Sequence, residues 1–230
     1  VIGVPSARRK VSLRDNRMLP DVAIIDPALT DGTPKPVTLA SGLDAITQVI
    51  EPYVCTKANR LTDALCRDAI PLGLAALVRL METEDTAARD DLAWVSLCGG
   101  LALANAGLGA VHGLAGPIGG AASAPHGVVC GALLPPVLAA NAKLATDVAA
   151  ARISEVQNWI SQAFGVETEQ ATTALQNWSQ HHGLPRLSQM GLQEDELQSI
   201  AQASLESSSM RGNPVALTER ALIDILYAAY

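Results

Sequence analysis

The chain has 230 residues, enough to bury one large hydrophobic core or two small ones. Hydrophobic residues make up 49% of the sequence and charged residues 17%, a composition that excludes a disordered protein. The net charge is −7 and aromatic residues are only 3%, so we expect no nucleic-acid partner. Asp, Arg, Gly or Pro breaks the apolar runs, so we also expect no membrane-spanning segment and no membrane partner.

The first 38 residues differ in character from the rest of the chain. Residues 1–4 and residues 22–25 are each predicted to be short strands, the second ended by Asp26 and Pro27. Beyond residue 38, Ala and Leu dominate, and apolar residues recur at intervals of three and four. This pattern predicts a mainly α-helical bundle attached to a fragment of sheet.

The first long helix is expected to begin near Ser41, because Ser41 and Asp44 fit a capping box, and to end or kink at Glu51-Pro52. Hydrophobic periodicity, together with helix start and stop residues, predicts the remaining helices. They are expected at residues 62–81, 86–105, 147–164, 169–181, 194–207 and 218–230, and one more is expected to run through Leu134 and Asn141.

The cysteines are not spaced like metal or redox motifs. Four are present, with no Cys-x-x-Cys pair, and all lie in apolar stretches of helical pattern: Cys55, Cys66, Cys98 and Cys130. We interpret them as packed, reduced thiols, which favours a cytoplasmic protein.

Chemistry is most plausible in the small-residue passage GLGAVHGLAGPIGGAASAPHG, residues 107–127. His112 and His126 flank what is expected to be a tight, glycine-rich loop, and imidazole is a common ligand of transition metals. Asp44 and Gln48, one helical turn apart, share a face and offer further donors. The alternative is that both histidines are structural and that Asp44 only caps its helix. No dinucleotide-binding, Walker or serine-hydrolase motif is found.

Four segments occur in an order and at separations that resemble a known family. They are LPDVAIIDPALT (19–30), SGLDAITQ (41–48), GAVHG (109–113) and APHG (124–127). The chain resembles the C-terminal part of the iron-containing (group III) alcohol dehydrogenases, and their maleylacetate reductase branch is also similar. The resemblance implies a dehydroquinate synthase-like fold. Residues 1–39 would be a remnant of the α/β nucleotide-binding domain with its linker, and residues 40–230 an all-helical, metal-binding catalytic domain.

The resemblance also implies the chemistry. It predicts an NAD(P)-linked alcohol dehydrogenase or carbonyl reductase that passes hydride between nicotinamide and an alcohol, aldehyde or ketone carbon. Fe²⁺ or Zn²⁺ would be held by Asp44, His112 and His126, with the two histidines as the catalytic residues. NAD or NADP would bind through an N-terminal domain that this chain lacks, so the chain alone is not expected to turn over. The family further implies a cytoplasmic homodimer.

Two positions depart from the family's pattern. Gln48 stands where iron-binding members carry a histidine ligand, and Gly116 stands where many members have a second loop histidine. Gln48 therefore remains only a candidate fourth ligand, since an amide oxygen binds Fe²⁺ less well than imidazole does. A three-ligand zinc centre, a metal-independent maleylacetate reductase-like enzyme and a non-catalytic helical binding module all stay open, and a metal-dependent hydrolase or lyase ranks last.

Overall fold

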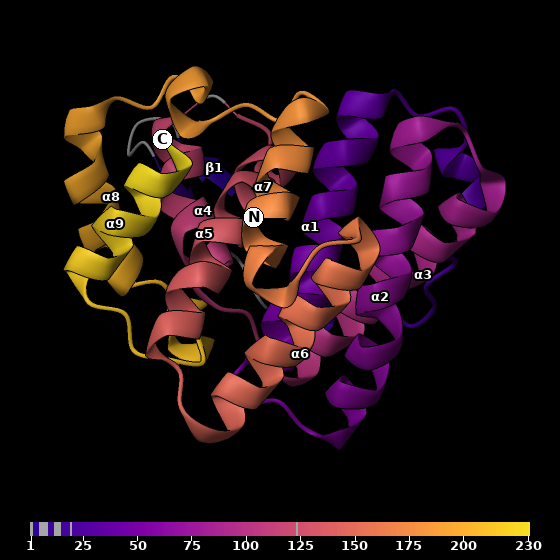
Figure 1. Ribbon diagram of the computed structural model, residues 1–230, viewed down its shortest axis with the longest axis horizontal. Helices are drawn as coiled ribbons and strands as arrows, with labels where there is room; N and C mark the ends of the chain where they lie inside the picture. The colour runs from indigo at the N-terminus through magenta and orange to yellow at the C-terminus, as the bar shows by residue number, and fades with distance from the viewer. Residues whose placement is uncertain (1, 5–8, 12–14, 19, 123) are drawn as a thin grey trace.

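The computed structural model describes residues 2–4, 9–11, 15–18, 20–122 and 124–230. Over these ranges the protein is a helical bundle with one small hairpin, which confirms the predicted fold class. Its helices are α1 Lys35–Val54, α2 Arg60–Glu82, α3 Thr86–Asn105, α4 Ala110–Ala121, α5 His126–Leu144, α6 Asp147–Phe164, α7 Ala171–His181, α8 Leu197–Leu205 and α9 Glu219–Ala229. Figure 1 shows α1 to α3 at one end of the molecule, α8 and α9 at the other, and α4 and α5 between them.

The N-terminal strands are only partly as expected. β1 (Ile2–Val4) pairs antiparallel with β2 (Arg9–Val11), so the first predicted strand is confirmed. The strand expected at residues 22–25 is wrong: Val22 and Ile24 are in irregular backbone and largely exposed. A strand requires a hydrogen-bonded neighbour, and among the described residues the sheet consists of β1 and β2 alone.

The first long helix begins earlier and ends later than predicted. α1 starts at Lys35 behind Pro34, with a second proline in its first turn, where a missing N–H costs nothing. Ser41 does not cap it; its hydroxyl lies inside the helix and donates to the Val37 carbonyl oxygen at 2.8 Å. Pro52 is buried within the helix rather than ending it. Asp44 is therefore free of the capping role that the sequence suggested.

Helices with local start signals were predicted well. Asn59 and Asp85 accept hydrogen bonds from the first turns of α2 and α3, and Thr218 caps α9 in the same way. Most of the expected ranges of α2, α3, α6, α7 and α9 are confirmed to within two residues at each end. The range 194–207 holds a 3-10 turn (Glu194–Glu196) followed by α8.

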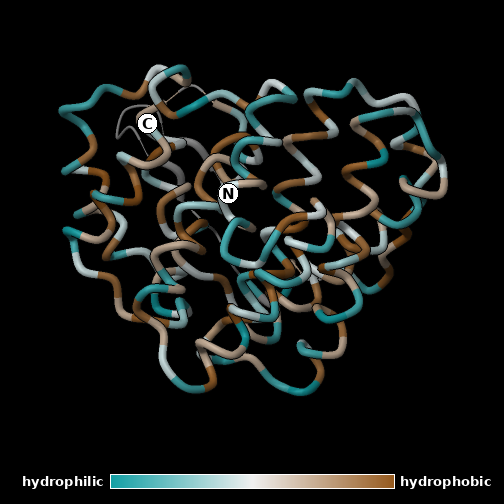
Figure 2. The backbone as a smooth tube through the Cα atoms, viewed as in Figure 1, coloured by the Kyte–Doolittle hydropathy of each residue, from teal (hydrophilic) through white to brown (hydrophobic). Residues whose placement is uncertain are grey.

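The core sits around α1, which packs against α2, α3 and α5. Apolar residues at intervals of three and four along α1 are fully buried, and hydrophobic and polar stretches alternate along the coils in Figure 2. Because one face of α1 is packed in the core, the side chains on its other face are held in fixed positions.

The apolar run in α5 is interrupted by Gly131, Pro135 and Pro136, as expected, but the helix continues through these residues. Of the single helices that the structure describes, α5 alone is long and apolar enough to cross a membrane, and α3 with α4 would also qualify if they were not bent by 99°. However, 56% of the apolar window of α5 is buried inside the bundle. Core helices of soluble proteins pass the same test, so this is weak evidence for a span.

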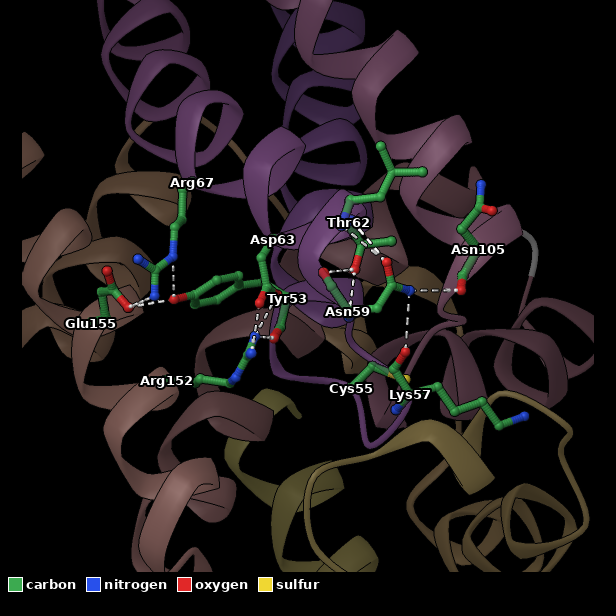
Figure 3. A network of polar contacts seen from close by, with 11 residues as sticks. Tyr53, Cys55, Lys57, Asn59, Thr62, Asp63, Arg67, Asn105, Arg152 and Glu155 are labelled. Carbon is green, nitrogen blue, oxygen red and sulfur yellow. Dashed lines mark hydrogen bonds and ion pairs between the residues drawn. The ribbon is translucent and has the colours of Figure 1, made fainter.

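A polar network joins α6 to the C-terminal part of α1 (Figure 3). Arg152 makes a bidentate ion pair with Asp63, at 2.6 and 2.7 Å, and donates to the Tyr53 carbonyl oxygen at 2.8 Å. The buried ring of Tyr53 lies between the guanidinium groups of Arg67 and Arg152, and its hydroxyl donates to Glu155. The network fixes the end of α1 that follows the candidate site.

Candidate metal centre

Three polar side chains share one face of α1. Asp44, Gln48 and Glu51 are spaced four and then three residues apart, so they lie one above the other on the helix. Glu51 is only 4% exposed and Asp44 is partly buried. A buried carboxylate is costly unless it is paired, and both of these carboxylates face histidine.

Glu51 determines where α4 begins. Its carboxylate accepts from the Val111 backbone N–H at 2.7 Å, and the side-chain oxygen of Asn213 accepts from the Ala110 N–H at 3.2 Å. These contacts satisfy N–H groups at the start of α4, and a negative charge there is favourable. The sequence predicted a loop across residues 107–127. That prediction is wrong for the middle of the segment, which is a helix from Ala110 to Ala121.

The same carboxylate orients His112. The Nδ1 atom of His112 lies 2.6 Å from Glu51 Oε2, which leaves Nε2 directed toward Asp44, 3.4 Å from its Oδ1. The His112 side chain is 8% exposed. A histidine that ligates a metal usually donates its other ring N–H to such a partner, which fixes the tautomer and the ring orientation.

His126 reaches the site from the first residue of α5. Gly127 lets α5 approach α1 closely, since a Cβ atom there would lie 2.4 Å from the Ala40 carbonyl oxygen. His126 Nε2 lies 3.9 Å from Asp44 Oδ1, and the two imidazole rings are 5.3 Å apart. The His126 side chain is 43% exposed, so solvent and small molecules can reach the site from this side.

The structure also brings in Cys130, which the sequence interpretation had placed among the packed core thiols. One turn after His126 on α5, its sulfur lies 3.5 Å from His126 Nε2 and 4.0 Å from His112 Nε2. Donor atoms of Asp44, His112, His126 and Cys130 all lie within 4.8 Å of one another. The interval of four between His126 and Cys130 was visible in the sequence, but it mattered only once both residues were known to lie on a helix.

Charge within the cluster favours a cation. Asp44 Oδ1 is buried and has no hydrogen-bond partner, although His112 Nε2 approaches it to 3.4 Å. Burial opposes ionisation of Asp44, but the two histidines outweigh it and hold its pKa below the usual value. Burial likewise acts to lower the pKa of His112, but its interactions with Asp44, Cys130 and Glu51 outweigh burial and raise the pKa. Burial raises the pKa of the Cys130 thiol to about 12.

The two departures from the family pattern lie beside the cluster. Gln48 contributes a hydrogen bond that helps to lower the pKa of Asp44. Gly116 lies one turn after His112 on α4, and a Cβ atom added there would meet nothing within 4 Å. An orphaned carboxylate oxygen, two imidazoles and a thiol suit a divalent transition metal, so the residues present fit the ion that the resemblance implies.

A separate hollow lies on another face of α1. It has a volume of about 630 Å³ and is lined mainly by apolar residues of α1, α3 and the segment before α1, among them Ile25, Ala45, Leu97 and Leu101. None of the four donor residues lines it.

Comparisons with known proteins agree with this architecture. Alcohol dehydrogenase 4 of Saccharomyces cerevisiae is 33% identical over 235 residues, which cover 100% of this chain and 60% of that protein. Lactaldehyde reductase of Escherichia coli is 32% identical over 240 residues, covering 100% and 60%. The solved structure of an iron-containing alcohol dehydrogenase from Thermococcus thioreducens superposes with a TM-score of 0.80 at 25% identity, covering 94% of this chain and 56% of that one.

The fold and the cluster define a class of protein, an all-helical domain built around a carboxylate-and-imidazole centre between α1, α4 and α5. The particular family follows from the sequence profile of the Fe-containing alcohol dehydrogenase family, C-terminal, which matches residues 38–230. The chain belongs to this family, as the resemblance of its motifs predicted. It spans about 60% of the length of the curated relatives that it matches.

Proposed function

We propose that this chain is the catalytic, metal-binding part of an NAD(P)-linked alcohol dehydrogenase or carbonyl reductase. The observation that carries the proposal is the convergence of Asp44, His112 and His126 on one point, with a buried Asp44 oxygen that lacks a hydrogen bond. We assign the metal to these three residues and leave Gln48 as a neighbour that orients Asp44. The division into residues 1–39 and 40–230 also remains our proposal.

Each residue has a defined task in this scheme. Asp44, His112 and His126 would hold a divalent metal that would supply Lewis-acid polarisation of an alcohol or carbonyl oxygen, and nicotinamide would supply or accept the hydride. Glu51 holds His112 in one tautomer, and Asp44 supplies the negative charge that offsets the cation. His126, the most exposed of the three, stands where a small substrate enters. The surrounding buried residues of α1, α4 and α5 keep the inner side of the centre dry, which strengthens electrostatic interactions there.

The substrate class follows from relatives with named substrates. Lactaldehyde reductase and 1,3-propanediol dehydrogenase act, by name, on small aldehydes or alcohols. We therefore propose a small alcohol, aldehyde or ketone as substrate, NAD or NADP as the second cofactor, and a homodimer as the assembly. The buried, unpaired cysteines agree with a cytoplasmic location.

The test is turnover in the protein that carries this chain together with a nucleotide-binding half. We expect NAD(P)H to form from a panel of small primary alcohols, and His126→Ala to reduce kcat/KM by at least about a hundredfold, since a ligand of the Lewis acid is removed. Undiminished turnover in His126→Ala would contradict the assignment of that residue. Metal-free protein that still reduces carbonyl substrates would instead favour the maleylacetate reductase-like alternative.

A further inference from the structure

Cys130 is set apart from the other cysteines by what its sulfur faces. Cys66 and Cys98 are fully buried in the hydrophobic core, and Cys55 donates to the Ala106 carbonyl oxygen. Cys130 is equally buried, yet its sulfur lies within 4.0 Å of the Nε2 atoms of both His112 and His126. Among the described residues, it is the one cysteine in a group of potential metal donors.

Four of the distances between donor atoms are close to, or slightly longer than, the edges of a tetrahedron around one ion. Zinc bound at its usual lengths to oxygen, nitrogen and sulfur would separate neighbouring donors by about 3.3 to 3.6 Å. The Asp44 oxygen lies 3.4 and 3.9 Å from the two imidazole nitrogens, and the Cys130 sulfur lies 3.5 and 4.0 Å from the same atoms. All four donor atoms lie within 4.8 Å of one another, so no pair has to close by more than about 1.5 Å for one ion to bind all four.

We propose that Cys130 is a fourth metal ligand, bound as a thiolate, and that the centre therefore prefers zinc over iron. This inference rests on the metal site of the proposed function and extends it to a residue outside the family's ligand set. On binding, the S–H bond breaks, a sulfur–metal bond forms and the proton leaves to solvent. Thiolate is a soft donor, and zinc binds such mixed donor sets more tightly than Fe²⁺ does.

The proposal also accounts for the tolerance of glutamine at position 48. With Cys130 reaching the cluster from α5, four donors are present without any ligand from Gln48 on α1. The fourth donor is then supplied by a different helix from the one that carries it in iron-binding relatives. Because His126 and Cys130 lie one turn apart on α5, a single helix sets the spacing of two ligands.

Cobalt substitution tests the ligand directly. Co²⁺ replaces zinc in such sites, and a thiolate bound to it gives a near-ultraviolet charge-transfer band in addition to the visible ligand-field bands. We expect this band when the chain is titrated with Co²⁺, and in the matched control Cys98→Ser, but not in Cys130→Ser. Zinc affinity of Cys130→Ser, measured by competition with a chromophoric chelator, should fall by more than about tenfold, and Fe²⁺ affinity should fall less.

The other possible results contradict either the assignment of Cys130 as a ligand or the metal site as a whole. Visible bands without the charge-transfer band in the unaltered chain, or a band that persists in Cys130→Ser, would overturn Cys130 as a ligand while leaving the Asp44, His112 and His126 site in place. Failure of the unaltered chain to bind Co²⁺ or Zn²⁺ would overturn that site as well. If Cys130→Ser does not fold, Cys130→Ala and the spectrum of the unaltered chain still decide the question.

Discussion

Glu51 and His112 are joined across two helices by a contact of 2.6 Å between a carboxylate oxygen and Nδ1, and the same carboxylate caps the start of α4. One buried side chain therefore both starts the helix that carries His112 and orients its ring. The candidate metal centre and the local fold therefore depend on the same residue.

Substitution of Glu51 tests this coupling. Glu51→Gln keeps an oxygen that can accept from α4 but removes the charge that makes His112 a better donor. We expect zinc affinity to fall about tenfold, in the range found for partners of metal-bound histidines. Chelator competition gives the affinity, and Glu167→Gln, at an exposed position after α6, is the control. Unchanged affinity in Glu51→Gln would show that the contact does not support the centre.

The close approach of α5 to α1 at Gly127 is a second test. Gly127→Ala places a Cβ atom against the Ala40 carbonyl oxygen, 2.4 Å away, so the helices must separate. We expect a loss of about 1 to 3 kcal/mol in unfolding free energy from this overpacking, together with weaker zinc binding because His126 and Cys130 move with α5.

Gly116→Ala is the matched control, since its Cβ atom meets nothing within 4 Å and alanine favours the helix. It should leave stability unchanged or raise it slightly in urea denaturation. Equal effects of the two substitutions would mean that the approach of the helices at Gly127 has no special importance.

A third prediction concerns acid stability. The buried Arg89 guanidinium pairs with Glu84 at 2.8 Å and also donates to the Thr38 hydroxyl. Its hydrogen bonds lower the pKa of Glu84 from 4.5 to about 2. The stabilisation is therefore complete above pH 4.5 and is lost as the pH falls toward 2.

The substitution Glu84→Gln should accordingly destabilise the protein at pH 7, and the difference between the two proteins should shrink between pH 4.5 and pH 2. Urea midpoints measured at several pH values check this. A difference that stays constant with pH, or that grows as the pH falls, would contradict it.

The sequence predicted helices well where the start signal was local. Asn59, Asp85 and Thr218 cap helices from the adjacent residue, and those helices were expected at nearly their observed positions. α4 was missed because its cap comes from Glu51 and Asn213, about 60 and 100 residues away. Its four glycines and one proline within 12 residues argue for a loop, and only tertiary contacts overcome that preference.

The candidate site was likewise predicted only in part. Asp44, His112 and His126 were expected on the basis of resemblance, and the structure brings them together as a cluster. The roles of Glu51 and Cys130 could not be predicted, because neither belongs to the motif and both depend on how α1, α4 and α5 pack. The sequence suggests a capping role for Asp44 only because it predicts the start of α1 at Ser41, six residues after the observed start at Lys35.

Metal content is the measurement that tests the central claim most directly. Freshly purified protein should contain about one equivalent of a divalent metal by mass spectrometry, as should the control His181→Ala/His182→Ala, which removes two histidines at the end of α7. His112→Ala/His126→Ala should keep its helical circular dichroism and lose the metal. Absence of metal from the unaltered protein, even after anaerobic loading, or equal metal in both double variants, would contradict the account.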